Sequence, residues 1–131
     1  MLKVILIDGH ALMIGKLEGI LDAKTAEAIV KFVEIQEEHL EMGADRFCDL
    51  SGLEGIDLSC ADIQRLTDRR RAFNPNDIHV KSAFLAHDFL TLGIARMYEQ
   101  LLNSPRIEVR VWTDLQAAAE WLGVDPCRLA S

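Results

Sequence analysis

The residues with the clearest capacity for chemistry lie in a short turn, Asp57-Leu58-Ser59. The hydroxyl of Ser59 can accept a hydrogen bond from a first-turn amide, because Ser59 directly precedes a helical pattern. We expect the capping role for Ser59, and we retain Asp57, Leu58 and Ser59 as candidate residues for binding a partner or ligand.

A group of arginines follows on the same predicted helix. Arg65 lies one turn before Arg69, and Arg69 and Arg70 project in neighbouring directions. An anionic partner could dock on this surface, since guanidinium groups bind carboxylates and phosphates. The alternative is a solvated helix face on which the arginines pair with Asp62 and Asp68. Arg69 and Arg70 are candidate binding residues under the first interpretation.

His87 follows a predicted strand and is the last candidate binding residue. Loops at the carboxyl ends of parallel strands commonly bind ligands in α/β proteins. Helix capping by Asp88 and Asp114 would explain the neighbouring carboxylates without chemistry. The four histidines and three cysteines are too scattered for a ligand motif, so we expect no metal, no cofactor and reduced thiols. Phosphate-binding and nucleophile motifs are also missing, and the sequence offers no support for catalysis.

Strands and helices alternate along most of the chain. The expected strands cover 3–8, 11–17, 46–50, 78–86 and 107–112. Expected helices follow Asp22, Ser59 and Asp88, and a last one covers 115–122. The first two strands form a hairpin near Gly9, and each later strand reaches the next through a helix, which favours parallel pairing. The sequence therefore predicts an α/β fold with a mixed five-stranded sheet, an N-terminal hairpin followed by βαβ units, and about four helices.

Size and charge restrict the fold and its partners. The 131 residues fit one domain, which we place at 1–124, with 125–131 as a loose C-terminal tail. The formal net charge of -7 repels phosphate backbones, so we expect no nucleic-acid partner. The longest apolar run is Val4–Ile7, and the N-terminus has no secretion signal pattern. We expect a cytoplasmic protein without a transmembrane segment.

Two stretches and the order of the expected elements resemble the STAS family of sulphate transporter and anti-sigma factor antagonist domains. The first stretch is Leu17–Asp22 followed by Thr25-Ala26, which is similar to the end of a strand and the start of the first helix in that family. The second is Phe47–Leu53 with Ile56–Cys60, which resembles the strand and loop that lead to the Asp-Ser-Ser-Gly turn of the antagonists. The resemblance extends from about residue 3 to residue 122.

The turn itself departs from the antagonist pattern. In the antagonists a kinase phosphorylates a serine of this turn, and the added charge breaks the complex with the partner. Here Leu58 replaces one serine and Cys60 replaces the glycine, so we expect Ser59 not to be a regulatory phosphosite. The chain looks closer to a SpoIIAA-like branch that lacks this turn and is related in fold to CRAL-TRIO lipid-carrier domains. The resemblance implies a non-catalytic regulatory or protein-interaction module. The alternative is a carrier for a small hydrophobic ligand or lipid, held between the helices and the sheet. Separately, we retain a homodimer as an expected form of the chain.

Overall fold

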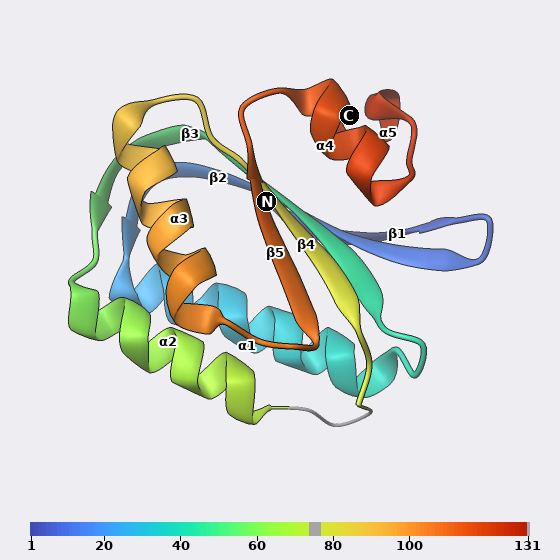
Figure 1. The fold of residues 1–131 in the computed structure, drawn as a ribbon, viewed down its shortest axis with the longest axis horizontal. Helices are drawn as coiled ribbons and strands as arrows, with labels where there is room; N and C mark the ends of the chain where they lie inside the picture. Colours follow the sequence, from blue (N-terminus) through green and yellow to red (C-terminus); the bar gives the residue numbers. More distant parts are fainter. Residues whose placement is uncertain (74–76, 131) are drawn as a thin grey trace.

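Five strands form one mixed sheet in the order β1-β2-β3-β4-β5 (Figure 1). The computed structural model describes residues 1–73 and 77–130. Its strands are β1 (Leu2–Ile7), β2 (His10–Asp22), β3 (Ala44–Asp57), β4 (Val80–Leu85) and β5 (Ile107–Trp112). β1 and β2 pair in antiparallel fashion, and the other neighbours are parallel. The predicted mixed five-stranded sheet with an N-terminal hairpin is confirmed.

The helices are α1 (Ala23–His39), α2 (Cys60–Ala72), α3 (Phe89–Leu102), α4 (Leu115–Leu122) and α5 (Pro126–Ala130). Each of the first four follows a side-chain cap whose oxygen accepts a hydrogen bond from a first-turn amide. The capping residues are Asp22, Ser59, Asp88 and Asp114. The predicted end of α2 at Asn74-Pro75-Asn76 lies outside the described residues, and α2 itself ends at Ala72.

The C-terminal segment differs from the sequence prediction. Residues 125–131 were expected to be loose, yet Pro126–Ala130 form α5. Leu129 is 1% exposed and packs in one cluster with Ala118 and Leu122 of α4. Five residues are too few to display a helical period, and the burial of Leu129 depends on contacts far away in the sequence.

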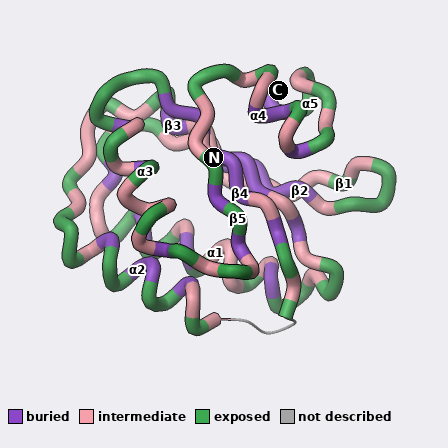
Figure 2. The backbone as a smooth tube through the Cα atoms, in the orientation of Figure 1, coloured by how far each residue is buried: buried purple, intermediate pink, exposed green. Residues whose placement is uncertain are grey.

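Helices cover both faces of the sheet. α1, α2 and α3 lie on one face, and α4 and α5 lie on the other (Figure 1). Because side chains alternate along a strand, Phe47 of β3 faces α4 and α5, whereas Arg46 and Cys48 face α1 to α3. The buried residues follow the strands between the two helical layers (Figure 2).

β2 and β3 are longer than the sequence predicts. Ser51 and Gly52 were expected to end the third strand, but both continue it. A Cβ atom at Gly52 would lie 2.6 Å from the carbonyl oxygen of Leu17, so the close pairing of the two strands requires glycine there. Register shifts after Lys16 and Gly19 accompany this pairing, and irregularities of this kind bend a sheet.

Candidate functional site

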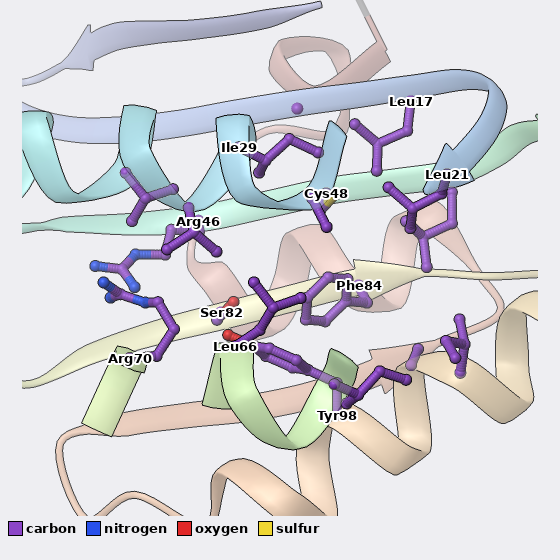
Figure 3. A pocket seen from close by; sticks show the side chains of 18 of the residues that line it. Leu17, Leu21, Ile29, Arg46, Cys48, Leu66, Arg70, Ser82, Phe84 and Tyr98 are labelled. Carbon is purple, nitrogen blue, oxygen red and sulfur yellow. The ribbon is translucent and has the colours of Figure 1, made fainter. Parts of the chain in front are cut away.

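A cavity of about 170 Å³ lies between the sheet and the helices α1, α2 and α3 (Figure 3). Most of its wall is aliphatic or aromatic, and each neighbouring element contributes side chains. Examples are Leu17 of β2, Ile29 of α1, Leu66 of α2, Phe84 of β4 and Ala95 of α3. An apolar cavity of about 150 Å³ in another protein binds benzene or xenon. This cavity is therefore large enough for a small apolar molecule.

Cationic groups gather at one end of the cavity. Arg46 of β3 and Arg70 of α2 are among the lining residues, and their guanidinium groups lie side by side at one end of the site (Figure 3). Both groups pair with Glu37 of α1, which is not part of the described cavity wall. Arg70 donates from Nη1 and Nη2 to the two carboxylate oxygens over 2.7 and 2.8 Å, and Arg46 donates from Nη2 to Oε2 over 2.5 Å. We call Arg46, Glu37 and Arg70 the buried ion cluster.

The buried ion cluster is shielded from solvent and unequal in charge. Arg46 and Glu37 are each 8% exposed and Arg70 is 2% exposed. Burial alone would raise the pKa of Glu37. The hydrogen bond from Arg70 and the positive charges of the two arginines together outweigh this effect, so the pKa lies below its ordinary value. Burial lowers the pKa of Arg46 more than the charge of Glu37 raises it. Two guanidinium groups share one carboxylate, which leaves one positive charge in excess.

Other polar groups line the same cavity. Ser82 of β4 is 7% exposed, and Tyr98 of α3 lies close enough to Arg70 and Arg46 for their charges to affect it. Burial raises the pKa of the Tyr98 phenol, and the two arginines oppose this rise. Burial also raises the pKa of the Cys48 thiol to about 12, so the thiol stays protonated at neutral pH and is a poor nucleophile. The described wall thus offers cations and neutral hydrogen-bonding groups around an apolar space.

The expectation of an exposed arginine surface is wrong for Arg70. Its bidentate pair with Glu37 turns the side chain inward, where it lines the cavity. Its neighbour Arg69 projects outward, with 43% of the side chain exposed, and pairs with Glu34 over 2.6 Å. Successive residues on a helix point in different directions, and here one arginine of the pair faces solvent and the other faces the core.

The remaining arginines of this helix fit the solvated-face interpretation. Arg65 pairs with Asp62 over 2.8 Å. Arg71 pairs with Asp68, and its guanidinium also donates to the carbonyl oxygen of Leu102 over 3.0 Å. These groups therefore pair with acidic side chains of the same helix, and Arg71 also connects it to the C-terminal end of α3.

The residues of the predicted turn, Asp57-Leu58-Ser59, do not all lie at the cavity. The Oγ of Ser59 accepts a hydrogen bond from the amide of Asp62 over 3.0 Å, and a carboxylate oxygen of Asp62 accepts one from the amide of Ser59 over 2.9 Å. This reciprocal capping box confirms the capping role expected for Ser59. Leu58 lines the cavity, whereas Asp57 is exposed at the end of β3. Of these three residues, Leu58 is the one that lies at the cavity.

His87 lies apart from the described cavity wall. It is exposed in the segment before α3, where Asp88 caps the helix by accepting a hydrogen bond from the amide of Thr91 over 2.8 Å. The next two residues are apolar and exposed: Phe89 is 96% exposed and Leu90 is 52% exposed. The beginning of α3 therefore presents an apolar pair to solvent.

A solved structure is similar to this chain over nearly its whole length. It is the crystal structure of an uncharacterized protein from the DUF3478 family with a SpoIIAA-like fold, from Shewanella loihica PV-4. The alignment covers 93% of this chain and 92% of that chain, with a TM-score of 0.62 and 16% sequence identity. The chain has a SpoIIAA-like fold. This confirms the fold that the STAS resemblance implies, although no family model and no curated protein matches the sequence.

Among the described residues, no helix has the length and apolar character needed to cross a membrane. Within 1–73 and 77–130, no group of three or more histidine, cysteine, aspartate or glutamate side chains could hold a metal ion. The cavity beside the buried ion cluster is the candidate functional site.

Proposed function

We propose that this SpoIIAA-like domain is a non-catalytic binding module that holds a small apolar ligand between the sheet and helices α1 to α3. The observation that carries the proposal is the apolar cavity of about 170 Å³. Protein interiors are packed as densely as organic crystals and contain few voids larger than a water molecule. A void of this size with apolar walls is a natural site for an apolar molecule. The high pKa of Cys48 supports a binding role rather than a nucleophilic one.

Filling the cavity from α1 tests this proposal. Ala26 is 7% exposed and lines the cavity, so the variant Ala26→Leu places an isopropyl group in the space that a ligand would use. We expect the affinity for a small apolar probe, hexan-1-ol, to fall by about tenfold or more, which corresponds to at least about 1.4 kcal/mol of binding free energy. The melting temperature should stay the same or rise, because the added atoms enter empty space. Nuclear magnetic resonance titration and thermal denaturation measure the two effects.

The control uses the same substitution on the same helix. Ala28 is exposed, so Ala28→Leu should change neither the binding of hexan-1-ol nor the melting temperature. Equal binding by Ala26→Leu and the wild type would contradict the cavity as the binding site. A wild-type protein that binds no apolar probe and carries no co-purified molecule in native mass spectrometry would contradict the proposed function itself.

Binding of a protein partner is a second candidate function, and the apolar pair Phe89-Leu90 favours it. A phenyl ring that is 96% exposed gains free energy when a contact removes it from water. Leu90 extends the apolar surface, and the exposed His87 lies two positions before Phe89 in the sequence. A second copy of the chain supplies this contact, which gives a homodimer.

The variant Phe89→Ser tests the second candidate. We expect the wild type to associate with itself as its concentration rises, and Phe89→Ser to stay monomeric over the same range, because the apolar contact is lost. Sedimentation velocity measures both. Met42 is 90% exposed and lies after α1, so Met42→Ser is a control that should associate like the wild type. A wild type that is monomeric at every concentration would contradict self-association through this surface.

A further inference from the structure

We infer that the ligand of this cavity is a small monocarboxylate, whose anionic group pairs with Arg46 and Arg70 while its apolar body occupies the rest of the space. The inference rests on the proposed function, since it requires an occupied cavity. It adds the chemical class of the ligand and its orientation. Four features of the site carry it: the excess charge, a free donor, the distribution of polar atoms and the cavity size.

The first feature is the unbalanced charge of the buried ion cluster. Glu37 is the shared carboxylate partner of both arginines, and all three residues are at most 8% exposed. An uncompensated charge in a protein interior destabilises the folded state, because the interior solvates it poorly. A ligand with a single negative charge would neutralise the cluster. A neutral ligand would leave the excess charge in place, and a dianion would reverse it.

The negative net charge of the whole protein does not prevent an anion from binding at the cavity. The formal net charge is -7, which disfavours anions at long range. At physiological ionic strength, however, exposed charges more than about 8 Å away are largely screened, whereas buried pairs are screened much less. The two guanidinium groups at the cavity therefore dominate the interaction with a bound anion.

The second feature is a hydrogen-bond donor without a partner. The Nε of Arg46 is buried and has no hydrogen-bond partner among the described residues. A buried donor left without an acceptor destabilises the folded state, because it has lost its hydrogen bonds to water. An ionised carboxylate is an acceptor with two oxygens, so it can satisfy such a donor and supply the missing negative charge together.

The third feature is the arrangement of polar and apolar atoms along the cavity. The guanidinium groups of Arg46 and Arg70 lie at one end, and the aliphatic side chains of Leu17 and Leu21 lie towards the other (Figure 3). A molecule with one anionic end and one apolar end fits this polarity in a single orientation.

The fourth feature is size. A cavity of about 170 Å³ is smaller than the pockets of about 300–1,000 Å³ that hold drug-sized ligands. It is close to the cavity of about 150 Å³ that accommodates benzene. The apolar body should therefore be of benzene size, as in hexanoate or benzoate, rather than the chain of a membrane lipid.

A matched pair of probes tests the inference. Hexanoate and hexan-1-ol have the same carbon chain and differ in the polar end group. With the full chain freed of any co-purified molecule by organic extraction, we expect hexanoate to bind at least about tenfold more tightly in a calorimetric or magnetic resonance titration, a difference of about 1.4 kcal/mol or more. Hexanoate should also raise the melting temperature more than hexan-1-ol at equal concentration.

Two variants of Arg46 test the pairing. Arg46→Met removes the excess charge and keeps the bidentate pair of Arg70 with Glu37, so the preference for hexanoate over hexan-1-ol should disappear. Arg46→Lys keeps the charge, so a preference for hexanoate should remain. Thermal denaturation shows whether each variant folds. If Arg46→Met does not fold, the comparison of the two probes on the wild type and on Arg46→Lys still tests the inference.

The outcomes separate this inference from the proposed function. Equal affinities of hexanoate and hexan-1-ol for the wild type would overturn the inference and leave the apolar binding function standing. Binding of neither probe would overturn both. A folded Arg46→Met variant that keeps the full preference for hexanoate would overturn the pairing of the anion with Arg46.

Discussion

Replacing Glu37 with glutamine should lower the free energy of unfolding by about 3–5 kcal/mol, the usual cost of breaking a buried ion pair by removing one partner. The carboxylate accepts three hydrogen bonds, two from Arg70 and one from Arg46, over 2.5–2.8 Å. Glutamine has nearly the same shape, so the change creates no cavity. What it removes is the negative charge, and two buried guanidinium groups are then left without it.

Chemical denaturation of Glu37→Gln and the wild type measures this effect. Glu38 is the next residue on α1 and is exposed, so Glu38→Gln is a matched control whose stability should change by no more than about 0.5 kcal/mol. A loss of less than about 1 kcal/mol in Glu37→Gln would show that the cluster is solvated in solution, since exposed ion pairs contribute that little.

The same variant has a defined pH dependence. The pKa of Glu37 in the folded protein lies below its reference value of 4.5, because the hydrogen bonds and charges of the arginines outweigh the effect of burial. A carboxyl group with a lowered pKa stabilises the folded state above the unfolded-state pKa and loses this contribution as the pH falls through the folded-state pKa. The stability difference between wild type and Glu37→Gln should therefore be constant near neutral pH and shrink below about pH 4.5.

Much of the fold could be predicted because it depends on local chemistry. The strand Ile107–Trp112 has the predicted bounds, since apolar and charged side chains alternate along it and Glu108 and Arg110 are exposed. The helices begin where Asp22 and Ser59 offer a side-chain oxygen to first-turn amides, and that rule needs no knowledge of tertiary contacts.

The extension of β3 could not be predicted in this way. Ser51 and Gly52 are typical turn residues, and their local preference is to end a strand. They stay extended because β2 pairs with them, and Gly52 is the residue that tolerates the approach of the Leu17 carbonyl group. Pairing with a distant strand therefore overrides the local preference.

The candidate site depended even more on distant contacts. Arg70 and Glu37 are 33 positions apart, and nothing in the sequence near Arg70 distinguishes it from the exposed Arg69. Arg46 was not a candidate, although a signal existed: it is a charged residue at the start of an apolar strand pattern, where burial requires a partner. Glu37 was not a candidate either, because nothing in the local sequence distinguishes it from the exposed acidic residues of α1, such as Glu38.

Replacing Leu129 with alanine should lower the free energy of unfolding by about 2–5 kcal/mol, the range for deleting a buried leucine side chain. Leu129 is 1% exposed and belongs to the core cluster that contains Phe47 of the sheet and Ala118 of α4. α5 is a short helix of 5 residues and cannot be stable alone, so its position depends on this contact. Equilibrium denaturation in urea measures the change.

Cys127 provides the control on the same helix. It is exposed, so Cys127→Ala should leave the stability within about 0.5 kcal/mol of the wild type. A similarly small effect of Leu129→Ala would mean that α5 leaves the sheet in solution and that the chain ends in a loose segment after all. A large effect of Leu129→Ala with none of Cys127→Ala would instead show that one buried side chain fixes the end of the chain. The tail would then be part of the core that supports the sheet from the face opposite the cavity.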